Sequence, residues 1–137
     1  MNPVPKTKDC LVLRTDFSDD AAWSALSAAI QEQVGEFRAQ VTPLSDRTFN
    51  GATVEDVARL AAEAGHTFIF IADQVALTHP EHPVLVVDLT NMPGSTFRVI
   101  PSEAWSVENN LSLGNMDFDE FASAVDGDGV FRGFRET

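Results

Sequence analysis

The sequence predicts a single α+β domain in which helices pack on one mixed sheet of five or six strands. Short apolar runs of strand length alternate with segments whose apolar residues recur every three or four positions, as on one face of a helix. With 137 residues, 44% of them hydrophobic, the chain can build one core. We expect this domain to cover residues 10–137, after a flexible segment 1–9. The predicted order is β-α-β-α-β-β-β-α, with a further strand at the end.

The first strand and helix are predicted between residues 10 and 35. Cys10 opens a short apolar run of strand length that ends at Arg14. Ser18 is a typical helix cap, because the two acids after it favour the positive end of a helix. Gly35 is the expected stop. One apolar stripe of this helix faces the core: Trp23, Leu26, Ile30 and Val34.

The second strand and helix are predicted between residues 36 and 65. Residues 36–41 alternate apolar and polar side chains, which is typical of a strand with one buried face, and Pro43 ends it. Thr53 caps the helix that follows, and Gly65 stops it. We expect Leu60 to be its chief apolar anchor.

Three further strands follow. Residues 67–72 are apolar throughout, as in a central strand covered on both faces. Residues 84–88 and 97–100 form an antiparallel hairpin, because the turn at 91–94 is too short for the crossover that parallel neighbours need.

The C-terminal third is less regular. Residues 102–107 are expected to form one or two helical turns, and residues 108–114 an irregular loop. Asp117, with Glu120 three residues on, begins a clearer helix. The last apolar stretch, 130–134, is expected to dock as an edge strand.

The charge balance excludes several classes of partner. The chain has nine lysines and arginines but 21 aspartates and glutamates, which gives a net charge of −12. Such a surface repels phosphate backbones and anionic lipids, so we expect neither nucleic-acid nor membrane binding. With a single cysteine and no signal-like or membrane-spanning apolar run, we expect a cytoplasmic protein.

Metal and cofactor sites are not predicted. His79 and His82 form the one close histidine pair, but two prolines hold them on a loop without further fixed ligands. Cys10 opens an apolar strand, where a thiol is buried and stays protonated. No glycine-rich phosphate loop or nucleophile motif is present, and we expect no cofactor.

One segment is the best candidate for a binding site. Residues 103–110 combine an aromatic ring with carboxylates and amides in what is predicted to be irregular backbone. Asp16, at the end of the first strand, lies where open α/β sheets bind ligands. In the alternative, Trp105 plugs the core and the two asparagines hydrogen-bond the loop backbone. The candidate residues are Asp16, Glu103, Trp105, Glu108, Asn109 and Asn110.

Three stretches of the chain resemble a family of small uncharacterised actinobacterial proteins that carries a domain-of-unknown-function label. They are residues 11–23, 97–111 and 115–121, and the resemblance spans nearly the whole chain. It implies a bacterial cytoplasmic origin and no particular activity.

Two functions are expected. The first is a non-catalytic module that binds a basic protein, a peptide or a small ligand, including an immunity-like inhibitor of a basic toxin, because complementary charge speeds encounter. The alternative is a small enzyme that uses Glu103, Glu108 or Asp16 as general acid or base. Either is compatible with homodimerisation along the edge formed by residues 130–134.

Overall fold

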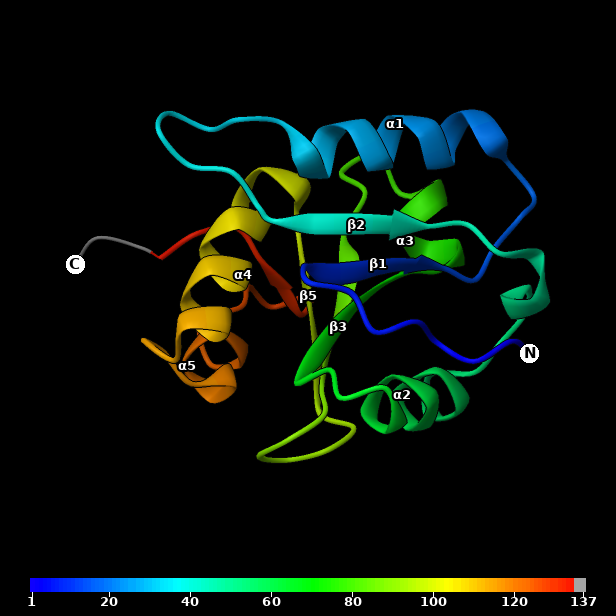
Figure 1. Cartoon of the computed structure of the whole chain (residues 1–137). Helices are drawn as coiled ribbons and strands as arrows, with labels where there is room; N and C mark the ends of the chain where they lie inside the picture. The colour runs from blue at the N-terminus through cyan, green and yellow to red at the C-terminus, as the bar shows by residue number, and fades with distance from the viewer. Residues whose placement is uncertain (135–137) are drawn as a thin grey trace.

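The computed structural model describes residues 1–134 and shows one six-stranded sheet in the order β2-β1-β3-β4-β5-β6, with helices on both faces (Figure 1). The predicted α+β class is therefore confirmed; residues 135–137 of the predicted domain lie outside the described part. The strands are β1 (Cys10–Arg14), β2 (Val41–Leu44), β3 (Phe68–Ala72), β4 (Val84–Asp88), β5 (Thr96–Val99) and β6 (Val130–Phe131). The α-helices are α1 (Asp20–Gln31), α2 (Val54–Glu63), α3 (Gln74–Thr78), α4 (Ala104–Leu113) and α5 (Phe118–Ala122).

The sheet has a parallel half and an antiparallel half. β1 pairs in parallel with β2 on one side and with β3 on the other. β4 runs antiparallel to both β3 and β5, which confirms the predicted hairpin, and β6 pairs in parallel with β5 at the edge. The first strand, β1, therefore lies in the interior of the sheet, and β6 lies at its rim.

The core lies on both faces of the sheet, as the continuous apolar character of residues 67–72 predicts. In β3, Phe68 and Phe70 face the layer formed by α1, α3, α4 and α5, whereas Ile69 and Ile71 face α2. Figure 1 shows α1 and α2 on opposite sides of the strands. Cys10 is buried, and this burial raises the pKa of its thiol.

Four local predictions are wrong. The second strand begins at Val41 and contains Pro43, which an edge strand tolerates. The first helix is capped by Asp19 and ends at Gln31, short of Gly35. On α2 the fully buried anchors are Val57 and Ala61, whereas Leu60 is only partly buried.

The fourth error concerns the segment predicted to be an irregular loop. Residues 108–113 belong to the ten-residue helix α4, which ends at Gly114 in a left-handed conformation (φ 71°). A short helix, α3, was also not predicted; Asp73 caps it by accepting from the Ala76 N–H. Thr53 and the Asp117–Glu120 capping box begin α2 and α5 as predicted.

The segment before β1 lies against the α2 side of the sheet. Val4 is buried there, and the Asn2 backbone N–H donates to Thr48 Oγ1 (3.1 Å). The flexibility of residues 1–9 stays a prediction. Across residues 1–134, no helix has both the length and the apolar character needed to cross a membrane.

Candidate functional site

The candidate residues of the C-terminal third lie on α4, which packs beside the loop that joins α1 to β2. Pro101 begins the short 3₁₀ turn that leads into α4, a position that suits proline because its missing N–H would have no helical partner. The sheet places the start of β2 next to α4. This contact brings residues 37–40 against residues 105–109.

Glu108 is the polar centre of this contact. Its side chain is only 4% exposed and accepts from the Gln40 backbone N–H (2.6 Å), Asn109 Nδ2 (2.9 Å) and Ser112 Oγ (2.6 Å). Three donors offset the cost of burying a carboxylate. Glu108 therefore holds the chain in position before β2.

The two asparagines bond to backbone carbonyls. Asn109 Nδ2 also donates to Arg38 O (3.2 Å), across to the α1–β2 loop. Asn110 Nδ2 donates to Ser106 O (2.8 Å), one turn back along α4. Both amides thus hold backbone, as the alternative interpretation of this segment expects.

Trp105 forms an aromatic stack with Phe37. The rings lie 4.3 Å apart between centroids with 10° between their planes. Trp105 is half-buried, and within residues 1–134 its buried Nε1 has no hydrogen-bond partner. Phe37 remains 48% exposed, so the outer ring of the stack faces solvent.

A tight turn presents Phe37. The Val34 N–H donates to Phe37 O (2.8 Å) and the Phe37 N–H donates back to Val34 O (2.9 Å). Gly35 takes φ 59° inside this turn, a conformation that glycine adopts without steric cost. The alternation of apolar and polar side chains in residues 36–41 was interpreted as a strand, but Phe37 packs on Trp105 of α4. Phe37 was therefore not predicted as a site residue.

A cavity of about 480 Å³ lies beside the turn that presents Phe37. Its walls come from the end of α1, from the α3–β4 loop and from the segment that leads into α4. It shares Val34 with the Phe37 turn. Apolar lining residues include Ala29, Val34, Pro80, Ile100 and Pro101, while Glu32 and Glu81 supply carboxylates. We call Val34, Phe37, Pro101, Trp105 and this cavity the Phe37–Trp105 surface.

Glu103, in the turn before α4, carries a partly buried carboxylate. Burial raises its pKa above the usual range. Its Oε1 lies against Gly133, where a Cβ atom would come within 3.2 Å of that oxygen. Glu108 follows Glu103 by five positions along the helix, so the two side chains point roughly 140° apart. The Glu108 carboxylate already accepts three hydrogen bonds within the protein. The two carboxylates do not form an acid–base pair.

Asp16 lies apart from these residues. It follows the C-terminal end of β1, whereas Gln40, the partner of Glu108, precedes the N-terminal end of β2. Because β1 and β2 are parallel, these are opposite ends of the two strands. The structure thus brings Trp105, Glu108 and Asn109 together and leaves Asp16 in a different place.

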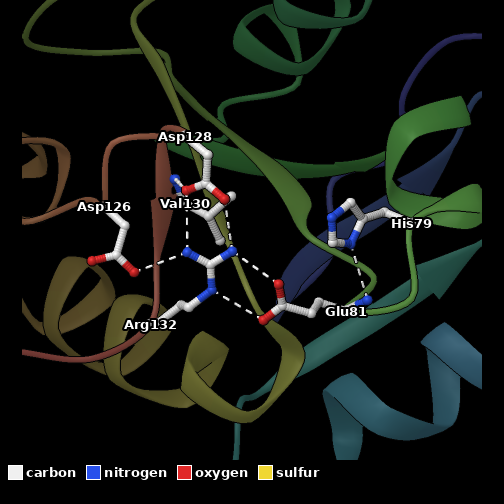
Figure 2. A network of polar contacts seen from close by, with 6 residues as sticks. All are labelled: His79, Glu81, Asp126, Asp128, Val130 and Arg132. Carbon is white, nitrogen blue, oxygen red and sulfur yellow. Dashed lines mark hydrogen bonds and ion pairs between the residues drawn. The ribbon is translucent and has the colours of Figure 1, made fainter.

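An arginine network fixes the segment just after β6 to one wall of the cavity (Figure 2). Arg132 bonds Glu81 (2.9 Å), Asp126 (2.8 Å) and Asp128 (2.7 Å). These bonds hold the pKa values of Glu81 and Asp128 below their usual range and raise that of Arg132. Nearby, the Glu81 N–H donates to His79 Nδ1 (3.1 Å). Across the described chain, no group of three or more His, Cys, Asp or Glu side chains could hold a metal ion.

A family model described as a domain of unknown function (DUF6924) matches residues 9–134. The chain belongs to the DUF6924 family. No curated protein matches it. Both the Phe37–Trp105 surface and Asp16 lie within the DUF6924 match.

Proposed function

We propose that this DUF6924 domain is a non-catalytic binding module whose Phe37–Trp105 surface takes a basic protein or peptide. The observation that carries the proposal is the exposed Phe37 ring, which is stacked on Trp105 and presented by a turn whose Val34 lines a cavity. An aromatic ring held rigid before binding loses little conformational entropy when a partner covers it.

The charge around the surface favours a cationic partner. Glu32 lines the cavity and Glu36 lies in the turn that presents Phe37, and among residues 1–134 neither forms an ion pair. Arg38 is the neighbouring cation. Glu81 is already bound by Arg132. A lysine or arginine beside an apolar side chain would therefore pair with the free carboxylates while the apolar group enters the cavity.

An inhibitor that neutralises a basic toxin is one form that this function would take. The proposal also includes a cytoplasmic location and an actinobacterial source, which the buried lone cysteine and the scarcity of lysine support. Self-association along β6 is a further proposal, which sedimentation velocity over a wide concentration range tests.

Selection from a random peptide library, followed by titration calorimetry, tests the proposed partner. We expect the selected peptides to combine lysine or arginine with an apolar residue and to bind more weakly as salt rises. Phe37→Ala should weaken them by about tenfold or more, as for a central aromatic contact. Met92→Ala is the matched control, because Met92 is an exposed apolar residue (65%) on the β4–β5 turn.

The role of charge is tested with Glu32→Gln combined with Glu36→Gln. This variant should lower the association rate and flatten its salt dependence. The proposal is overturned if selection yields peptides without cationic residues, or if Phe37→Ala binds the selected peptides as tightly as Met92→Ala does.

A further inference from the structure

A second pocket lies at the C-terminal ends of the parallel strands, away from the Phe37–Trp105 surface. From β1 the chain crosses to β2 on one side, and β3 then returns to the other side of β1. The connections that follow β1 and β3 therefore part from each other at this edge. In open α/β sheets, ligands bind in the crevice at such a reversal of strand order.

The pocket has a volume of about 490 Å³ and is built from three connections. They are the β1–α1 loop, the segment between β2 and α2, and the start of α3. The Gly51 N–H donates to Thr15 O (2.8 Å), and the Thr15 N–H donates to Ala72 O (3.0 Å), so backbone bonds fix the three walls to one another. The lining residues that offer polar side chains are Thr15, Asp16, Ser18, Arg47, Asn50 and Gln74.

One side of the pocket carries an available cation. Arg47 is exposed, and the structure gives it no ion pair among residues 1–134. Its guanidinium lies 5.4 Å from the centroid of the Phe17 ring. Arg14 supports the same ring at 4.3 Å and is itself 3% exposed and paired with Asp20 (2.9 Å). Arg47 is thus held beside the pocket with its donors free.

The pocket also carries a carboxylate. Asp16 Oδ1 accepts from the Ser18 N–H (2.8 Å) and from Ser18 Oγ (2.6 Å). These bonds lower the pKa of Asp16, which keeps the group ionised near neutral pH. Asp16 Oδ2 has no hydrogen bond within the described residues. One free oxygen of an ionised carboxylate therefore remains for a cationic ligand group.

The neighbouring helix ends disfavour phosphate. Asp19 caps α1 by accepting from Ala22, and Asp73 caps α3 by accepting from Ala76. At each of these ends one backbone N–H is already taken by a carboxylate, and the negative charge of that carboxylate repels a second anion. A ligand with one negative and one positive charge matches Arg47 and Asp16 better.

We infer that this pocket binds a small zwitterion of the amino-acid class, with its carboxylate on Arg47 and its ammonium group on Asp16. The amides of Asn50 and Gln74 and the hydroxyl of Thr15 are placed to bond polar groups on the remainder of the ligand. This site is separate from the surface proposed for a basic partner.

Thermal unfolding with the twenty free amino acids at millimolar concentration tests this assignment, and calorimetry follows for each amino acid that raises the melting temperature. We expect at least one to bind saturably. Its N-acetyl and methyl ester forms, which each lack one charge, should bind at least tenfold more weakly. The same measurements with dipeptides show whether the site binds a free amino acid or a short peptide whose two termini lie close together.

Variants then locate the binding. Arg47→Gln and Asp16→Asn should each weaken the ligand at least tenfold, while Arg38→Gln, an exposed arginine near Phe37, should not. Since Arg47 has no ion pair to lose, Arg47→Gln is expected to fold normally, which circular dichroism checks. The inference is overturned if no amino acid or dipeptide binds, or if binding persists unchanged in Arg47→Gln and Asp16→Asn. Phe37→Ala should leave this binding intact, so that the two proposals fail separately.

Discussion

The Glu108 carboxylate accepts three hydrogen bonds while almost fully buried, and its partners come from three positions: the residue before β2, its own neighbour and the next turn of α4. At the scale of the residue, this side chain joins the C-terminal third of the chain to the parallel half of the sheet. A residue expected to contact a partner thus contributes to the interior of the domain.

Replacing Glu108 with alanine should lower the free energy of unfolding by about 3 kcal/mol, because three donors lose a charged acceptor inside the protein. Urea unfolding followed by circular dichroism measures this change. Glu36→Ala is the control, since Glu36 is exposed and unpaired within the described chain and should change stability by less than about 0.5 kcal/mol. Equal effects of the two substitutions would contradict the structural role of Glu108.

At the scale of the element, the capping box of α5 is the clearest local determinant. Asp117 accepts from the backbone N–H of Glu120, and the Glu120 side chain accepts from the Asp117 N–H (3.1 Å). A five-residue helix depends on such caps, because few hydrogen bonds lie within it. The cap also positions Phe118 and Phe121 in the core.

Asp117→Ala should therefore destabilise the protein by about 1 kcal/mol, the usual cost of losing an N-cap acceptor. Glu120→Gln keeps an acceptor at the same place and should be nearly neutral. Thermal unfolding of both variants gives the comparison. A loss in Glu120→Gln as large as that in Asp117→Ala would show that charge at the helix end, and not the reciprocal bonds, stabilises α5.

The elements that sequence reasoning predicted are those whose signal is local. β3 is apolar at every position, and Thr53 and Asp117 act as caps through neighbouring residues. Residues 36–41 and 108–114 were misassigned because their conformation depends on contacts distant in sequence. Phe37 stacks on Trp105, and Glu108 and Asn109 bond residues 40 and 38, which offsets the weak helix preference of asparagine.

The same distinction holds for the candidate sites. Trp105 and Asp16 could be singled out by residue type and position. Phe37 and Arg47 could not, because only the fold brings them beside those two residues.

At the scale of the whole molecule, Arg132 connects the segment just after β6 to the α3–β4 loop through Glu81. The low pKa values of Glu81 and Asp128 mean that the native state binds fewer protons at these groups than the unfolded chain. Their contribution to stability is therefore complete above the ordinary carboxylate pKa values, near 4, and is lost as pH falls through the lowered values.

Arg132→Gln should accordingly reduce the difference between the free energies of unfolding at neutral and at acidic pH. Denaturant unfolding at a series of pH values from 7 to about 3 measures it. Arg59→Gln is a suitable control, because Arg59 forms exposed ion pairs within α2 alone. The network would have no such role if both variants followed the pH profile of the parent protein.

The order of the strands bears on how the chain folds as it is synthesised. Apart from the exchange of β1 and β2, each new strand is added beside the one before it, from β3 to β6. The sheet can therefore grow outward in one direction while translation proceeds, without inserting a late strand between two early ones. In this sequence of events Arg132 emerges after every strand is complete, and its bonds to Glu81, Asp126 and Asp128 close the finished domain.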